Sequence, residues 1–260
     1  MLIDSHCHLI HEDYKEAPEK IIEDSKKEGV DKFITIGTSV EESRKMIEVA
    51  ERNPEVFCTV GIFPQENSDK SLEELEKSLE EQIGKSKKII AVGECGMDIV
   101  EFSNMKRSIK DQVALFEMQI NLAIKHKLPI VIHNRNGDKC ILELLEKYKN
   151  SGLFGVNHCF VSNWKTAKKI LDLGFYISFS GVITYPSGKN ILEVVEKVPM
   201  DRFLVETDAP YLAPEGHRGE INYPKYVRIV AKKVAEVKQK PYDEIERISY
   251  ENTCRLFKLF

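Results

Sequence analysis

Residues 2–9 read Leu-Ile-Asp-Ser-His-Cys-His-Leu and bear on the choice between two kinds of α/β fold. The apolar start of this stretch predicts a buried first strand. Two histidines follow, where an open doubly wound sheet usually carries a glycine-rich turn. A (β/α)8 barrel, in contrast, gathers functional side chains at the carboxyl ends of its strands. The segment therefore favours the barrel, and the doubly wound sheet remains the structural alternative.

Seven more short apolar runs follow the first, and longer amphipathic stretches separate them. Several runs are almost entirely apolar, as strands buried on both faces should be. The eight expected strands are Leu2–Cys7, Lys32–Thr38, Val56–Ile62, Lys88–Glu94, Pro129–His133, Gly155–Phe160, Phe175–Val182 and Arg202–Asp208. In a chain of 260 residues this alternation predicts a single (β/α)8 TIM-barrel domain spanning residues 1–260.

Helix signals occupy the stretches between these runs. Ser71 and Glu74 form a capping-box pattern ahead of a leucine-rich stretch. Residues 108–127 place their apolar side chains on one stripe, and a last helix is expected from Asp243 to Lys258. The helices are therefore expected to cover the outside of the barrel.

Composition limits the classes of partner. Lys and Arg total 38 against 42 Asp and Glu, which gives a net charge of -4 and no global basic field for nucleic acid. The amino-terminal residues lack a secretory signal pattern, and no stretch approaches the ~18 apolar residues of a membrane span. The six cysteines form no Cys-x-x-Cys pair and are expected to be reduced. We expect a cytoplasmic protein with no membrane partner, and a monomer as the default.

Polar side chains recur at the predicted strand ends, where barrel enzymes build active sites. These residues are Asp4, His6, His8, Glu94, Asp98, His133, Arg135, His158, Glu206 and Asp208. Since alternate residues of a strand share a face, His6 and His8 should both point inward. The same alternation predicts that Cys7, Cys95 and Cys159 pack outward against the helices. The ligand atoms of this site are then nitrogen and oxygen.

The histidines and carboxylates at the strand ends predict a metal centre. Its six candidate ligands are His6, His8, Glu94, His133, His158 and Asp208. Four histidines and two carboxylates exceed the three protein ligands that a single catalytic zinc usually takes, which favours two divalent ions. Glu94 lies mid-sequence among the ligands and is the natural bridge. Zinc, magnesium and manganese all accept this donor set.

Other strand-end residues keep two interpretations. Asp4, Asp98 and Glu206 are either buried hydrogen-bonding partners that orient the ligands or direct participants. Arg135 is either half of an ordinary ion pair or a substrate-binding cation.

Six segments in order make the chain resemble the TatD-like metal-dependent DNases, within the wider amidohydrolase-type barrels. They are Ile3-Asp4-Ser5-His6-Cys7-His8-Leu9, Gly93-Glu94-Cys95-Gly96-Met97-Asp98, His133-Asn134-Arg135, His158-Cys159-Phe160, Glu206-Thr207-Asp208-Ala209-Pro210-Tyr211 and Arg218-Gly219-Glu220-Ile221-Asn222-Tyr223-Pro224. The resemblance implies a TIM-type barrel with a divalent metal centre that hydrolyses DNA phosphodiester bonds. Because the chain is acidic, we expect weak, salt-sensitive binding of DNA ends or single strands, as in an exonuclease.

Residue roles follow from the resemblance by matched position. One metal would be held by His6, His8, Glu94 and Asp208, and the second by Glu94, His133 and His158. Arg135 and Arg218 would face substrate phosphate, since the planar guanidinium grips two phosphate oxygens at once. Our mechanistic hypothesis is that a metal-activated water attacks phosphorus and that Asp208 accepts its proton.

Two segments depart from the resembled pattern. Many relatives have a histidine in the turn where this chain has Gly61-Ile62-Phe63-Pro64-Gln65, and often an aromatic residue where it has Ile99. Both positions lie where substrate would rest, and neither removes a metal ligand. A bimetal hydrolase of amides, esters, lactones or small phosphate esters is the alternative function, and a catalytically silent binding module is the second.

Overall fold

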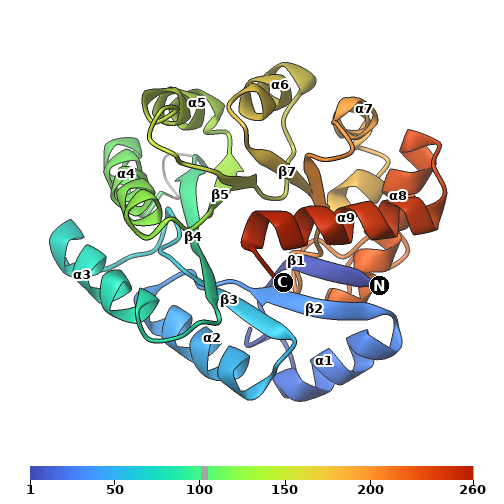
Figure 1. Ribbon diagram of the computed structural model, residues 1–260, viewed down its shortest axis with the longest axis horizontal. Helices are drawn as coiled ribbons and strands as arrows, with labels where there is room; N and C mark the ends of the chain where they lie inside the picture. Colours follow the sequence, from blue (N-terminus) through green and yellow to red (C-terminus); the bar gives the residue numbers. More distant parts are fainter. Residues whose placement is uncertain (101–104, 260) are drawn as a thin grey trace.

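The computed structural model describes residues 1–100 and 105–259 and has eight parallel strands paired in sequence order. The strands are β1 (Leu2–Cys7), β2 (Val30–Thr35), β3 (Val56–Val60), β4 (Ile89–Asp98), β5 (Ile130–Arg135), β6 (Gly155–Asn157), β7 (Tyr176–Phe179) and β8 (Phe203–Val205). A parallel bridge between Cys7 and Ala209 brings the chain after β8 back to β1. The predicted (β/α)8 barrel is confirmed (Figure 1).

Helices surround the strands on the outside of the barrel (Figure 1). They are α1 (Pro18–Lys27), α2 (Val40–Arg52), α3 (Leu72–Ile83), α4 (Ile109–His126), α5 (Asp138–Lys147), α6 (Trp164–Asp172), α7 (Lys189–Lys197), α8 (Val227–Lys238) and α9 (Tyr242–Phe257), with short 3-10 turns η2 (Gly181–Thr184) and η3 (Pro224–Tyr226). The predicted capping box is present, because Ser71 and Glu74 bond reciprocally at the start of α3. Within the described residues, no helix combines the length and apolar character needed to cross a bilayer.

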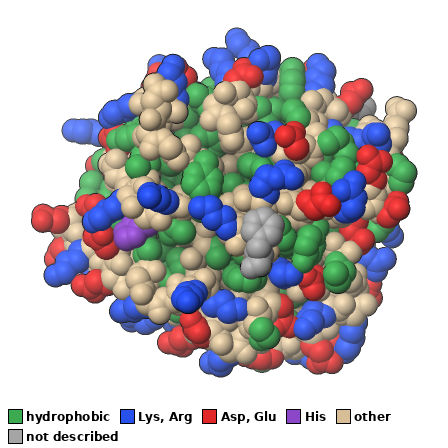
Figure 2. Space-filling model, viewed as in Figure 1, with side chains coloured by type: hydrophobic (Ala, Val, Ile, Leu, Met, Phe, Trp, Pro, Cys, Tyr) green, Lys and Arg blue, Asp and Glu red, His purple; other side chains and the backbone are tan. Residues whose placement is uncertain are grey.

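Two buried layers hold the barrel together. Ile3, Ile34, Val131 and Leu204 belong to an inner cluster of strand side chains, and Phe257 from α9 packs into the same cluster. The larger cluster lies between the strands and the surrounding helices. Helix α9 therefore covers the end of the barrel at which the strands begin, near both chain termini (Figure 1). Basic and acidic side chains intermingle on that face of the molecule (Figure 2).

Strand β4 runs four residues beyond its predicted end at Glu94 and finishes at Asp98. Gly93 and Gly96 have positive φ angles of 130° and 137°, a conformation that residues with a side chain rarely adopt. A Cβ at Gly96 would lie 2.2 Å from the carbonyl oxygen of His133, so glycine lets β4 approach β5 closely. Glu94 is consequently held in the middle of a strand rather than at its end.

Strands β6 and β8 end earlier than predicted, at Asn157 and Val205. His158, Glu206 and Asp208 therefore lie just after the strands, in the turns that follow them. Asp208 adopts a left-handed backbone with φ 59°, which interrupts the extended conformation assumed for residues 202–208. Backbone strain of this kind is common at functional sites.

Candidate metal centre

The six predicted ligands come together at the carboxyl end of the barrel. His8, Glu94, His133, His158 and Asp208 line a cavity of about 580 Å³. The sixth ligand, His6, is fully buried against them, with Nε2 3.5 Å from a carboxylate oxygen of Glu94 and 3.5 Å from one of Asp208. Residues more than 200 positions apart in the chain thus meet at the mouth predicted from the strand ends.

Glu94 lies at the centre and turns one oxygen to each side. Its Oε1 is 2.6 Å from Nδ1 of His133 and 2.9 Å from Nε2 of His158. Its Oε2 is 3.5 Å from Nε2 of His6 and 3.9 Å from that of His8. A carboxylate placed between two histidine pairs would be within reach of a cation held on either side.

Electrostatics couples the protonation of Glu94 and His158. Burial by itself would raise the pKa of Glu94, but the charge of His158 and hydrogen bonds from His133 and His158 hold it well below its usual value. Burial likewise opposes the charged form of His158, yet Glu94 and Glu206 raise the pKa of this imidazole well above its usual value. Because a metal ligand must be deprotonated, a cation binding here has to displace the proton of His158.

The other side of the centre pairs Asp208 with two histidines. Burial opposes the charge on Asp208, but a hydrogen bond from His8 and the charges of nearby histidines lower its pKa. The pKa of His8 is raised, since the bond to Asp208 and the charge of Glu94 outweigh burial. Burial and the charge of His158 lower the pKa of His6. The neutral form of the imidazole is thus favoured at His6.

Unpaired nitrogen atoms in the cluster fit a metal ion. Nδ1 and Nε2 of His6 and Nε2 of His133 are buried without a hydrogen-bond partner among the described residues. A buried polar atom without a partner is costly, and coordination to a cation would satisfy it. Three groups offer ligand atoms within 4.8 Å of one another: His6, His8 and Asp208; Glu94, His133 and His158; and His6, His158 and Glu206. Imidazole and carboxylate donors suit zinc, manganese or magnesium.

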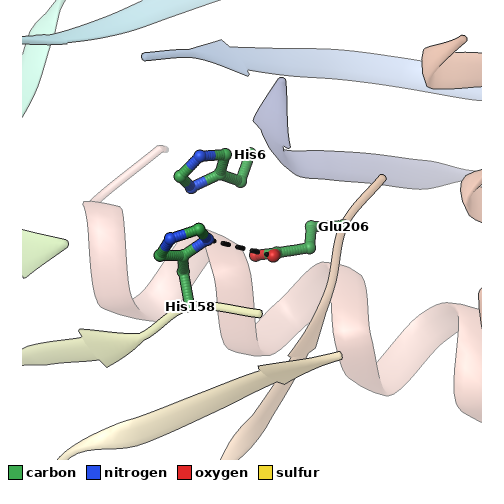
Figure 3. A group of neighbouring side chains, drawn as sticks. All are labelled: His6, His158 and Glu206. Carbon is green, nitrogen blue, oxygen red and sulfur yellow. Dashed lines mark hydrogen bonds and ion pairs between the residues drawn. The ribbon is translucent and has the colours of Figure 1, made fainter. Parts of the chain in front are cut away.

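Glu206 supports His158 from the side away from Glu94. Its Oε1 lies 3.3 Å from Nδ1 of His158 and accepts the Cys159 backbone N–H at 2.9 Å. Its Oε2 accepts the hydroxyl of Ser178 at 2.5 Å. Figure 3 shows the carboxylate meeting the edge of the His158 ring, which stacks on His6 at 3.9 Å. With both oxygens engaged, this arrangement favours an orienting role for Glu206, of the kind that fixes a ligand's tautomer.

Asp4 ties β1 to the turn that carries Asp208. Its two carboxylate oxygens accept the backbone N–H and the hydroxyl of Thr207, at 2.9 Å and 2.5 Å. Burial raises the pKa of Asp4 to about 8 despite these bonds. Asp4 thus lies beside the site and anchors the residue next to Asp208.

Arg135 forms an ion pair with Asp98, which was one of its two predicted roles. The buried carboxylate accepts both Nε and Nη2 of the guanidinium, the latter at 2.7 Å. Arg135 also lines the cavity, with about half of its side chain exposed. Two of its three guanidinium nitrogens are therefore engaged by the protein.

Arg218 is not among the residues that line the cavity. Its guanidinium lies over the ring of Tyr185, 4.6 Å from the centroid, and 4.0 Å from a carboxylate oxygen of Glu215. The cation–π contact holds the side chain on the loop after β8.

The predicted outward orientation is wrong for Cys159. This residue lines the cavity, with Sγ 3.1 Å from the hydroxyl of Ser180. Its φ of 42° breaks the strand alternation on which the prediction depended. Cys7 and Cys95 are buried in the outer core cluster, as predicted.

Further side chains line the cavity beside the six candidate ligands. Glu42 and Glu66 add acidic side chains to the wall, and Tyr211 and His11 join it from the loops after β8 and β1. Phe63, from the segment that departs from the family pattern, packs edge-on to His133 at 4.7 Å and lines the cavity. Glu42 and Glu66 carried no signal that associated them with the site before the barrel closes. His11 and Tyr211, in contrast, each lie three residues after a predicted ligand.

Asn222 fixes the loop that presents Asp208. Its buried side-chain amide donates to the carbonyl oxygens of Thr207 at 2.9 Å and Tyr211 at 2.6 Å. Its backbone N–H donates to the carbonyl of Pro210 at 3.0 Å. One side chain therefore closes the turn around Asp208.

Asn222→Ala is expected to lower the free energy of unfolding by about 2–3 kcal/mol, because two buried carbonyls lose their donor. Chemical denaturation measures the change. The exposed Asn150→Ala variant is the matched control and should stay within about 0.5 kcal/mol of the parent. Equal stability of the two variants would contradict this role for Asn222.

A family model described as TatD related DNase matches residues 3–258. The chain belongs to the TatD family. The match includes every residue of the candidate metal centre. The resemblance noted from the six sequence segments is thereby confirmed.

TatD relatives of similar length share about a third of their residues with this chain. YabD of Bacillus subtilis, named an uncharacterized metal-dependent hydrolase, is 34% identical over 260 residues and covers 100% of both chains. YcfH of Escherichia coli strain K12, with the same description, is 34% identical over 263 residues, which cover 99% of this chain and 96% of YcfH. This TatD-family protein is accordingly a metal-dependent hydrolase.

Solved structures agree with the fold of this TatD-family protein. The crystal structure of YjjV, a TatD homologue from Escherichia coli K12, superposes with a TM-score of 0.89 at 29% identity, covering 99% of this chain and 98% of that one. An uncharacterized amidohydrolase from Saccharomyces cerevisiae superposes with a TM-score of 0.83 at 18% identity, over 98% and 99% of the two chains. The second likeness concerns the fold alone.

Proposed function

We propose that this TatD-family hydrolase is a deoxyribonuclease that removes nucleotides from DNA ends with the help of two divalent ions. The observation that carries the proposal is the position of Glu94, whose two oxygens face separate histidine pairs. A pair of cations at such a bridge suits phosphodiester hydrolysis, because the attacking and leaving oxygens can both be stabilised. The family description as TatD related DNase supports the same reaction.

Each residue of the centre has a place in this proposal. His6, His8 and Asp208 would hold one ion, and His133 with His158 the other, with Glu94 shared between them. Bound there, the ions supply Lewis-acid polarisation of the scissile group and lower the pKa of the attacking water. Asp208 accepts the proton of that water. Glu206 keeps Nε2 of His158 directed at the site by holding its Nδ1.

The charges around the cavity support weak DNA binding. Arg135 lines the wall, but Asp98 neutralises it, and Glu42 and Glu66 add negative charge. Arg218 is engaged with Tyr185 outside the cavity. Few phosphates can therefore be contacted by unpaired cations of the protein, which fits an enzyme that acts on chain ends rather than along a tract.

End-labelled single- and double-stranded DNA tests the proposal, with and without EDTA and with Mg²⁺, Mn²⁺ or Zn²⁺ restored. Cleavage should require both metal and Glu94, and should be lost in Glu94→Ala. The logarithm of DNA affinity should fall with the logarithm of salt concentration with a shallow slope of about -1 to -2. Intact DNA beside an occupied metal site, or a steep slope, would contradict the proposal.

A second candidate is a hydrolase of small carboxylic or phosphate esters. Phe63, Val182 and Leu212 give the cavity an apolar wall beside the acidic Glu42 and Glu66. Such a wall favours a compact substrate with an apolar body over a polyanion. Turnover of p-nitrophenyl acetate or p-nitrophenyl phosphate without DNA cleavage would favour this candidate.

A further inference from the structure

A histidine–tyrosine pair lies at the mouth of the cavity, outside the six ligands. Nε2 of His11 is 2.7 Å from the hydroxyl oxygen of Tyr211, and the two rings meet edge to face with centroids 5.1 Å apart. Both side chains line the cavity. Tyr211 also packs edge-on to His8, with centroids 5.8 Å apart, and its backbone N–H donates to the carbonyl of Asp208. The phenol is therefore held beside the candidate ligands.

The surroundings of His11 decide which partner donates in this pair. The backbone N–H of Asp13 donates to Nδ1 of His11 at 3.2 Å, so the hydrogen of the neutral ring is on Nε2. His11 therefore donates from Nε2 to the phenolic oxygen of Tyr211. The hydroxyl hydrogen of Tyr211 therefore points away from His11 and is free to bond another acceptor.

Several other donors on the cavity wall are engaged by the protein. The hydroxyl of Thr38 donates to Glu42, and the side-chain amide of Asn134 donates to Asp138 at 2.8 Å. Arg135 uses Nε and Nη2 on Asp98. For Tyr211, no acceptor of its hydroxyl hydrogen is present among the described residues.

We propose that the Tyr211 hydroxyl, directed by His11, donates a hydrogen bond to an oxygen of the group that is hydrolysed. Tyr211 is then a catalytic residue that touches substrate, and His11 a positioning residue that acts through it. The pair supplies an uncharged donor in a cavity whose arginine is neutralised by Asp98. This inference rests on the proposed function only in taking the scissile group to be a phosphate or carboxylic ester.

Tyr211→Phe tests the donor, because it keeps the ring and removes only the hydroxyl. With equal metal content, kcat/KM should fall about 10- to 100-fold, the range for a hydrogen bond to a charged oxygen. The affinity of the manganese-loaded protein for inorganic phosphate, measured by calorimetry, should weaken by about tenfold or more. Tyr226→Phe is the matched control, since Tyr226 stacks on His217 away from the cavity lining.

His11→Phe tests the positioning role. It should lower kcat/KM by about 3- to 10-fold, as a lost neutral hydrogen bond does. The double variant His11→Phe/Tyr211→Phe should be no worse than Tyr211→Phe alone. A merely structural role for His11 would instead multiply the two losses.

The outcomes separate this inference from the proposed function. Activity is measured on DNA, bis-p-nitrophenyl phosphate and p-nitrophenyl acetate. Cleavage of the acetate alone would refute the nuclease proposal and still let Tyr211→Phe be judged on that ester. Unchanged kcat/KM and phosphate affinity in Tyr211→Phe would overturn the inference, as would a wild-type protein that binds no phosphate and hydrolyses none of the three substrates.

Discussion

Glu94→Gln is expected to reduce metal-dependent hydrolysis by at least about 10³-fold and to leave the purified protein depleted of metal. The carboxylate is nearly completely buried and lies within 4 Å of a ring nitrogen of each of the four histidines. Glutamine keeps the size of the side chain but offers one oxygen and no charge. The two histidine pairs would then lose the anion that offsets the repulsion between two cations.

Metal content after gel filtration and turnover of the preferred substrate measure this effect. Glu146→Gln is the matched control, because Glu146 is exposed and contacts only Lys149 among the ion pairs of the described residues. Denaturation curves should be recorded in parallel, since removing one partner of a buried charge cluster costs about 3–5 kcal/mol. A folded Glu94→Gln protein with normal metal content and turnover would refute the bridging role.

The sequence predicted the architecture well because the barrel is governed by patterns that are local in the chain. Eight apolar runs at regular intervals are enough to specify a parallel sheet covered by helices. Since strand ends of such a sheet meet at one edge, His6, Glu94 and His158 could be associated without any structure. This association depends only on the order of the strands and helices along the chain. Errors of a few residues in the predicted strand ends do not change it.

Features that depend on backbone detail were not predictable in this way. The left-handed turn at Cys159 reverses the face on which its side chain lies, and Gly93 and Gly96 adopt positive φ angles within β4, which runs on to Asp98. Glu66 becomes a neighbour of the site only through closure of the barrel, which spacing along the chain does not encode.

Asp208→Asn is expected to lower kcat by about 10²- to 10⁴-fold, the usual contribution of a general base. Asp208 lies 3.5 Å from Nε2 of His6 and 3.6 Å from that of His8, at the edge of the cavity. Its φ of 59° belongs to the left-handed region, which Asn tolerates as well as Asp does. The substitution therefore removes the charge and the proton acceptor without straining the turn that Asn222 closes.

Turnover and metal content, measured together, distinguish proton transfer from simple coordination by Asp208. An asparagine oxygen can still ligate a cation, so the variant should retain most of its metal while kcat falls and KM changes little. Asp201→Asn, at an exposed position just before β8, is the control for the loss of one negative charge. If Asp208→Asn bound metal normally and turned over at nearly the wild-type rate, the proton would have to leave by another group. If the variant lost metal and activity in proportion, Asp208 would act as a ligand rather than as the base.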